Sequence, residues 1–167
     1  MFTVPGIPML FQGQEFLEDE WFRDTDPLDW GKKQRFAGIF RMYQDLIRLR
    51  RNWDNRTRGL AGHRVNVFHD KVIAFHRWDH GGPGDDVIVA INFANRSYDS
   101  YAIGFPREGR WRVRFNSDWS GYSPDFGDHP GYDTEAHSRP RDGLAFSGNI
   151  GIAPYSALVL TQDAQAQ

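Results

Sequence analysis

The spacing of apolar residues changes once along this chain, close to residue 60, and this change constrains the fold more than any other feature. Between Lys32 and Asn52 apolar residues recur every three or four positions, which is the pattern of one buried helix face. From Val65 onward they alternate with polar residues in short runs bounded by Gly, Asp, Asn or Pro, as in half-buried strands. The sequence therefore predicts a helical part followed by an all-β part.

The helical part is predicted to be one amphipathic helix. Its apolar face comprises Phe36, Ile39, Phe40, Tyr43, Leu46 and Ile47. Asp29 is a plausible N-cap, and the late arginines Arg48 and Arg51 suit the negative end of the helix dipole. The apolar run at residues 7–11 has a turn signal on each side, as expected of a strand buried on both faces. Strand and helix together make one βα unit.

The all-β part is predicted to hold seven or eight short strands. They are expected near residues 65–67, 73–75, 87–93, 98–103, 110–115, 144–146 and 157–160. In the fifth run, alternation should place Trp111, Val113 and Phe115 on one face and the arginines between them on a solvated face. Residues 116–142 are expected to form a long loop that is functional or mobile. The fold class is thus mainly β: a Greek-key-like antiparallel β-sandwich preceded by one βα unit.

Composition excludes several functional classes. Forty per cent hydrophobic and 15% aromatic residues suffice for a packed core, so disorder is not expected. With 20 basic and 22 acidic residues spread along the chain, there is no basic stripe for nucleic acid. No apolar run approaches the roughly 20 residues of a membrane-spanning helix. The chain has no cysteine and no signal-peptide pattern at its start, so we expect a cytoplasmic location without disulfides or thiolate metal sites.

Several ordered motifs resemble a known family. They lie at residues 5–16 (Pro-Gly-Ile-Pro leading to Gly-Gln-Glu-Phe), 26–30 (Asp-Pro-Leu-Asp-Trp), 89–93 (Val-Ala-Ile-Asn-Phe), 109–112, 116–118 and 153–160. In this order they resemble the last barrel strand, the loop entering the last barrel helix, and the C-terminal all-β domain of the α-amylase superfamily. The likeness is greatest to 1,4-α-glucan (glycogen) branching enzymes. It covers nearly the whole chain, and it is more specific for the superfamily than for branching as the reaction.

The resemblance implies a domain division and an absence of catalytic residues. Residues 1–58 would be the last strand and helix of a truncated (β/α)₈ barrel, 59–162 the C-terminal β-sandwich domain, and 163–167 a disordered tail. The family's nucleophilic aspartate, acid/base glutamate and second aspartate would all precede Met1. Retaining glycoside chemistry needs two carboxylates about 5 Å apart on a rigid scaffold. We therefore expect no catalytic residue and no activity from this chain alone.

Three residues are candidates for substrate contact. Glu15 follows the predicted barrel strand, where side chains face the active site of a barrel. The alternative for Glu15 is a structural hydrogen-bonding acid. Trp119 and Tyr122 lie in the long polar loop and could stack on sugar rings, although anchoring the loop is the commoner role of such aromatics.

No metal site or cofactor is predicted. Asp24, Asp26 and Asp29 depart from the calcium-loop spacing, and a solvated loop explains them better. His76 and His80 lie four apart on a strand that runs into a loop, so they do not share a face.

Three functions remain open. The first is the C-terminal part of an α-glucan-active enzyme, of branching or amylase type, that supports the missing catalytic barrel and contacts α-glucan. The second is a stand-alone carbohydrate-binding module. The third is a docking domain, because one small sandwich cannot cover all of the apolar residues in the N-terminal strand and helix. An exposed strand and helix of this kind also predict a homo-oligomer or a frayed N-terminus.

Overall fold

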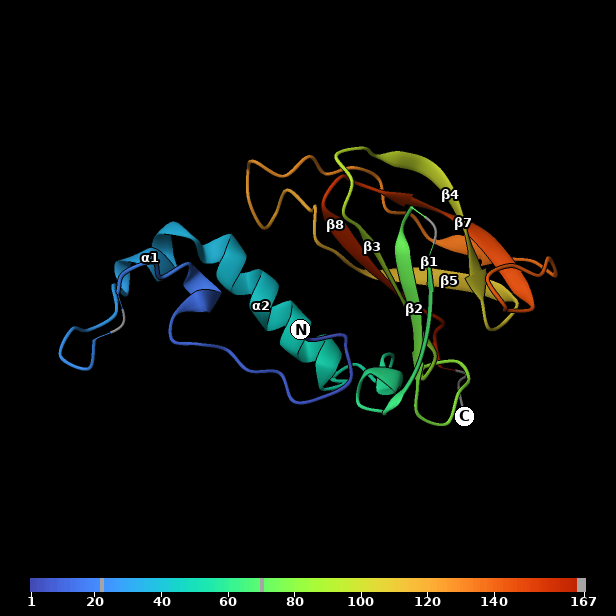
Figure 1. Cartoon of the computed structure of the whole chain (residues 1–167), viewed down its shortest axis with the longest axis horizontal. Helices are drawn as coiled ribbons and strands as arrows, with labels where there is room; N and C mark the ends of the chain where they lie inside the picture. Colours follow the sequence, from blue (N-terminus) through green and yellow to red (C-terminus); the bar gives the residue numbers. More distant parts are fainter. Residues whose placement is uncertain (22, 70, 165–167) are drawn as a thin grey trace.

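The structure, a computed structural model, describes residues 1–21, 23–69 and 71–164 (Figure 1). Two helices and two short 3₁₀ helices come first: η1 (Gln14–Phe16), α1 (Gly31–Arg35), α2 (Ala37–Arg50) and η2 (Arg58–Leu60). The strands follow: β1 (Arg64–His69), β2 (Ile73–Trp78), β3 (Val87–Asn92), β4 (Tyr98–Phe105), β5 (Gly109–Asn116), β6 (Thr134–Ala136), β7 (Phe146–Ile152) and β8 (Ser156–Thr161).

The strands form two antiparallel sheets. Six of them lie in the order β1-β2-β3-β8-β5-β6, and β4 pairs with β7 in a second sheet. The last strand, β8, lies between β3 and β5, pairing Val89 with Val159 on one side and Val113 with Leu160 on the other. The predicted antiparallel β-sandwich is therefore confirmed.

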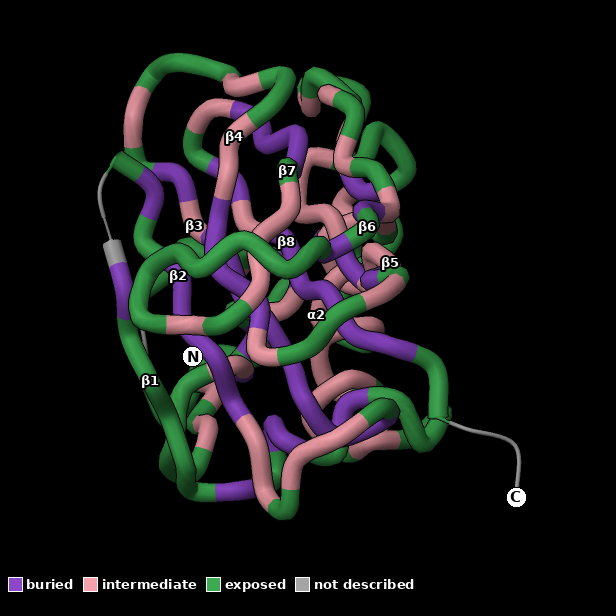
Figure 2. The backbone as a smooth tube through the Cα atoms, turned by 90° about the vertical axis from the view of Figure 1, so that its right-hand side faces the viewer, coloured by how far each residue is buried: buried purple, intermediate pink, exposed green. Residues whose placement is uncertain are grey.

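The large sheet is covered on both faces. Between the two sheets lies a core that contains Trp111, Ile88, Leu158 and Ile150. On the opposite face, Phe75, Val89, Phe115 and Val159 form a second core, and Met42, Leu46 and Leu49 of α2 pack against it. The central strands β3 and β8 are consequently buried along their length, whereas β1 is largely exposed (Figure 2). The continuous apolar runs in β3 and β8 follow from this double coverage.

Three details of the β part differ from the sequence-based expectation. The alternation in β5 breaks at a register shift between Val113 and Phe115. As a result, Trp111 lies in the core between the sheets and Phe115 in the core beneath α2. Strand β7 begins at Phe146 rather than ending there, and the predicted loop at 116–142 contains the short strand β6.

The N-terminal part also differs. Residues 7–11 form no strand, because a strand buried on both faces needs neighbours and none of the described strands lies beside this segment. Ile7 is 97% exposed and Met9 76% exposed, which agrees with the expectation that one sandwich cannot cover this segment. The predicted helix is divided at Phe36, whose φ of −113° and ψ of 38° interrupt it. Asp29 precedes α1, and its carboxylate accepts the Gly31 N–H at 2.9 Å.

Of the predicted tail, residues 165–167 lie outside the described part of the chain. Asp163 is described and paired: its carboxylate lies 2.7 Å from Arg112 Nε and also contacts Arg114. The hydrogen bond from Arg114 and the nearby arginine charges lower the pKa of Asp163.

Candidate functional site

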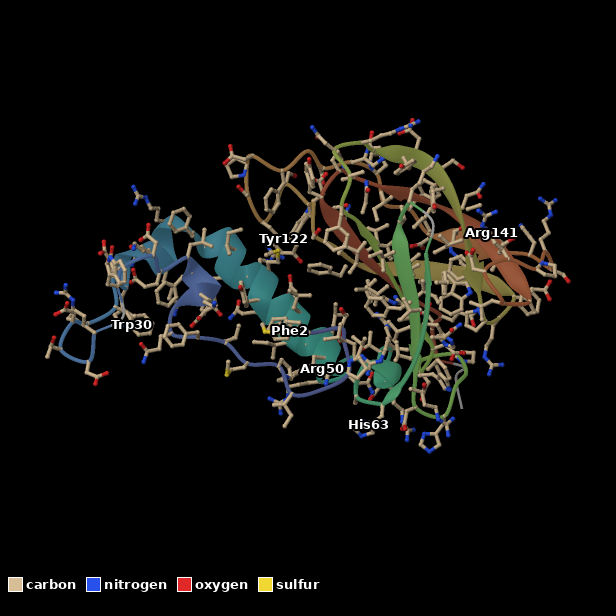
Figure 3. The ribbon with its side chains drawn as sticks, viewed as in Figure 1. Phe2, Trp30, Arg50, His63, Tyr122 and Arg141 are labelled. Carbon is tan, nitrogen blue, oxygen red and sulfur yellow. The ribbon has the colours of Figure 1, made fainter. Side chains whose placement is uncertain are left out.

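Helix α2 is shared by two parts of the molecule. One side packs on the large sheet through Met42, Leu46 and Leu49. On another side the N-terminal segment runs along the helix, and the Phe2 ring meets Tyr43 edge-on at 6.0 Å (Figure 3). Helix α2 therefore connects the N-terminal segment to the β-sandwich.

Two arginines fix the backbone of the N-terminal segment. Arg50 of α2 donates hydrogen bonds to three carbonyls of this segment, those of Phe2 (3.3 Å), Val4 (2.9 Å) and Gly6. Arg77 of β2 is 0% exposed, and it donates to the carbonyls of Thr3, Leu60, Gly62 and Arg64. We call Arg50 and Arg77 the arginine clamp. It joins the N-terminal segment, α2 and β2, which are far apart in sequence.

Arg77 has no carboxylate partner in the part of the chain that the structure describes. Among the described residues no acidic group lies within ion-pair distance of its guanidinium, and carbonyl oxygens supply its acceptors. Burial, together with the neighbouring Arg50 charge, lowers the pKa of Arg77. A buried cation satisfied only by carbonyls needs every one of them, so loss of the clamp would leave several polar groups unpaired.

The carboxylate of Asp118 orders the loop that follows β5. Asp118 accepts the backbone N–H groups of Gly127 (3.0 Å) and His129 (2.8 Å), while its own N–H donates to Asn116. The loop then contacts α2. The Tyr122 hydroxyl donates to the Asp45 carboxylate at 2.8 Å, and the ring packs on Phe115. Burial and the Asp45 hydrogen bond raise the pKa of Tyr122.

Gly38 makes this contact between loop and helix possible. A Cβ atom at position 38 would lie 2.1 Å from the Tyr122 carbonyl oxygen and 2.7 Å from its carbon. Only a residue without a side chain lets the loop backbone approach α2 so closely. In the sequence Gly38 stands within a helical pattern, and nothing nearby indicates that the Tyr122 backbone packs against it.

The structure brings Trp119 and Tyr122 together, with ring centroids 4.9 Å apart in an edge-to-face arrangement. Tyr122 is 7% exposed, so its ring lies mainly inside the protein, between α2 and the sheet (Figure 3). Trp119 is 36% exposed, and the Arg41 guanidinium lies over its ring at 4.8 Å. A surface hollow of about 380 Å³ next to Trp119 is also lined by Asn116, Asp128, His129 and their neighbours.

Glu15 lies apart from these aromatics, in η1 of the N-terminal segment, and is half-buried. The ordered acid nearby is Glu18, which sequence reasoning did not single out. Its carboxylate accepts the Asp29 N–H at 2.7 Å and the Lys32 ammonium at 2.6 Å. These hydrogen bonds, Lys32 first, lower the pKa of Glu18 to about 2. A hollow of about 440 Å³ lies beside them, lined by Phe11, Gln14, Glu18, Trp21, Arg23, Asp26 and their neighbours.

One group of potential metal ligands occurs among the described residues, at the turn after β2. Ligand atoms of Asp79, His80 and Asp85 all lie within 4.8 Å of one another. However, Arg58 Nε lies 3.2 Å from Asp79 and 3.8 Å from Asp85 and supplies positive charge there. The Asp85 carboxylate already accepts the N–H groups of Asp79 and His80. These hydrogen bonds and the Arg58 charge order the turn.

His76, the other histidine considered from the sequence, is buried and lies 2.9 Å from the Asp86 carboxylate. Burial alone would raise the pKa of Asp86, but hydrogen bonds from His76, Gly82 and Arg107 outweigh it, so this pKa is lowered.

In the part of the chain that the structure describes, no helix is long and apolar enough to cross a membrane.

Several known proteins resemble this chain in sequence. The 1,4-alpha-glucan branching enzyme GlgB of Paramagnetospirillum magneticum is 31% identical over 173 residues, which cover 98% of this chain and 23% of that enzyme. The enzyme of the same name from Rhodopseudomonas palustris is 32% identical over 176 residues, with 98% and 23% covered. The chain thus spans about a quarter of the length of these relatives.

Solved structures resemble the fold at lower identity. An alpha-amylase from H. orenii superposes with a TM-score of 0.58 at 16% identity, covering 97% of this chain and 33% of that one. A debranching enzyme from Nostoc punctiforme gives 0.59 at 16% identity, with 96% and 29% covered. At this identity the likeness concerns the fold alone.

The family model described as "Alpha amylase, C-terminal all-beta domain" matches residues 66–163, which is more than half of the sequence. This chain therefore belongs to the family of alpha-amylase C-terminal all-beta domains.

Proposed function

We propose that this chain is the C-terminal part of an α-glucan-active enzyme, of branching or α-amylase type, and that its β-sandwich positions the end of a catalytic barrel. The chain is inactive alone, because the two carboxylates that retaining glycoside chemistry needs are expected on the part that precedes it. The relatives named as branching enzymes, about four times longer, support branching as the reaction. The predicted cytoplasmic location is part of the same proposal.

The observation that carries this proposal is the arginine clamp. Arg77, on β2 of the sandwich, holds the carbonyl of Thr3, and Arg50 on α2 holds the carbonyls on either side of it. The residues that follow, 7–11, are those that resemble the last barrel strand. Hydrogen bonds from Arg50 and Arg77 to the backbone immediately before such a strand would fix the position of the strand.

A hybrid enzyme tests the proposal. In it this chain replaces the matching C-terminal part of the Paramagnetospirillum magneticum branching enzyme, and branching is followed by the fall in absorbance of the amylose–iodine complex. We expect activity from the hybrid and none from the chain alone. Arg77→Ala should lower the temperature at which the hybrid loses activity, whereas Arg110→Ala, an exposed arginine on β5, should not. Activity of the chain alone, or equal inactivation temperatures for the two variants, would contradict the proposal.

A second candidate function is glucan contact, proposed for Trp119, Tyr122 and Glu15. The partial exposure of Trp119 beside its hollow favours this function, and Tyr122 would act mainly by supporting Trp119. Affinity electrophoresis of the chain in glycogen gels tests this function. Trp119→Ala should abolish retardation, while Trp53→Ala, which removes a tryptophan that is 67% exposed outside the loop, should leave it unchanged.

A third candidate is self-association through the N-terminal segment, favoured by the exposure of Ile7 and Met9. Sedimentation velocity should show a dimer or larger species that becomes a monomer in the Ile7→Lys, Met9→Lys double variant. A concentration-independent monomer of the unmodified chain would exclude this candidate.

A further inference from the structure

Three arginines converge on a single carboxylate near the C-terminal end of the described chain. Arg112 Nε lies 2.7 Å from the Asp163 carboxylate, Arg114 donates a hydrogen bond to it, and Arg56 Nε lies 3.7 Å from it. Guanidinium groups gathered around one anion are the arrangement by which proteins hold carboxylates and phosphates. Asp163 therefore occupies an anion-binding site that is made by arginines of its own chain.

A surface hollow of about 250 Å³ lies next to this site. Its lining includes Arg48, Arg56, Arg114 and one acid, Asp54. We call it the arginine hollow. The C-terminal end of α2, the segment between α2 and η2, and β5 supply these residues. The side chains of Arg48 and Arg56 are 61% and 51% exposed, so an anion from solvent can reach them.

The arginine hollow carries more positive than negative charge. Three arginines face one aspartate in its lining, and the adjacent Asp163 is matched by Arg112, so an excess of two positive charges remains. Arg48 also contacts Asp45, but it shares that carboxylate with Arg41. The excess is local, because the whole chain has a formal net charge of −2. An anion of charge −2 would neutralise it.

The size and the donors of the arginine hollow favour a phosphate group. Pockets for drug-sized ligands measure about 300–1,000 Å³, so this smaller hollow suits a small anion better than an oligosaccharide. Guanidinium groups match pairs of phosphate oxygens, and a phosphate monoester carries a charge of about −1.5 to −2 near pH 7. The arginine hollow shares Val113 and Arg114 with the hollow beside Trp119, which leaves a place for a sugar attached to the phosphate.

We propose that the arginine hollow binds a phosphate dianion, either free or esterified to a sugar, and that Asp163 competes with this ligand for Arg56 and Arg114. The inference does not depend on the proposed function. The internal carboxylate keeps the arginines ordered, and it also weakens the binding of an external anion. Removal of the Asp163 charge should therefore tighten the binding of phosphate.

Isothermal titration calorimetry of the chain with sodium phosphate and with glucose 1-phosphate tests the site, at about pH 8 and constant ionic strength. We expect saturable binding. Arg56→Gln should weaken it at least about threefold, because one exposed charge contact is lost. Arg141→Gln is the control, since this exposed arginine also faces one aspartate but lies on the side of the sandwich away from α2 (Figure 3). It should leave the Kd unchanged.

Asp163→Asn supplies a second readout. This substitution should tighten the binding at least about threefold, and phosphate should raise the Tm more in this variant than in the unmodified chain. Trp119→Ala distinguishes the two sources of phosphate. Weaker binding of glucose 1-phosphate alone would identify a sugar phosphate as the ligand, whereas unchanged binding of both compounds would identify free phosphate.

Three results would overturn the proposal. The first is the absence of saturable binding from both the unmodified chain and Asp163→Asn. The second is a Kd that Arg56→Gln leaves unchanged or that Arg141→Gln raises equally, because the binding would then take place elsewhere. The third is unchanged or weaker binding in Asp163→Asn, which would show that Asp163 does not compete for the arginines.

Discussion

Replacing Gly38 by alanine sets two physical effects against each other. Gly38 is the second residue of α2, and helix propensity alone predicts that alanine stabilises by up to about 1 kcal/mol. The structure predicts the opposite sign, because the new Cβ would lie 2.1 Å from the Tyr122 carbonyl oxygen. That oxygen is backbone and cannot rotate away, so the loop or the helix has to move.

The expected magnitude follows from the cost of forcing an additional methyl group into a packed site, about 1–3 kcal/mol. An approach of 2.1 Å to a backbone atom places Gly38→Ala in the upper part of this range, at about 2–3 kcal/mol. After a propensity gain of about 1 kcal/mol is subtracted, the free energy of unfolding should fall by roughly 1–2 kcal/mol. For a chain of this length, that corresponds to a Tm lower by roughly 2–8 °C. The Tyr122–Asp45 hydrogen bond is the contact most directly strained by the movement.

Urea unfolding followed by tryptophan fluorescence, and Tm measured by circular dichroism, provide the assay. Gly31→Ala is the matched control: it adds a methyl group at the first residue of α1, where the nearest atom is the flexible Asp29 carboxylate at 3.0 Å. If Gly38→Ala proves neutral or stabilising, as helix propensity predicts, then the loop does not press on α2 and the account of this contact is refuted.

Three further predictions concern charged and titrating groups. The pKa of Glu18 is lowered, so the stability that this carboxylate contributes is present above pH 4.5, its ordinary pKa, and is lost as the pH falls towards 2. Carboxyl NMR should show this titration, and Lys32→Gln should move the pKa of Glu18 towards its ordinary value. The pKa of Tyr122 is raised, so its contribution is present below the ordinary value of 10.0 and is lost as pH rises above it. Between pH 9 and 11 the unfolding free energy should therefore fall more in the unmodified chain than in Tyr122→Phe, and equal losses would contradict the buried hydroxyl. Arg77→Ala should lower the unfolding free energy by about 3 kcal/mol, because it leaves buried carbonyls unpaired. The same substitution should speed cleavage by protease within residues 1–11. Unchanged cleavage would show that the arginine clamp does not hold the N-terminal segment.

The sequence predicted the β-sandwich well because its central strands are apolar on both faces or alternate regularly. The same periodicity misplaced Phe115, since one register shift in β5 moves every later residue to the opposite face. The strand expected at residues 7–11 shows a different limit. Its apolar run is real, but a strand also needs neighbouring strands, which the pattern of a single segment does not reveal.

The candidate sites were harder to predict for related reasons. Trp119 and Tyr122 were found because aromatics stand out in a polar loop, yet nothing local indicated that Tyr122 would bond to Asp45, 77 residues earlier. Arg77 resembled any strand arginine until the structure showed it fully buried. Long-range hydrogen bonds of this kind depend on how the elements pack and leave no periodic signal.

The central position of β8 has a consequence for biosynthesis. Strands β1, β2 and β3 are consecutive in the chain and can pair as soon as they leave the ribosome. Strand β5 joins them only through β8, which is the last of the described strands to be made. Until then the growing chain holds two half-sheets, each with an unpaired edge of the kind that associates with other chains. A stop codon placed before Ser156 would therefore yield a protein prone to aggregation, although it would contain seven of the eight described strands.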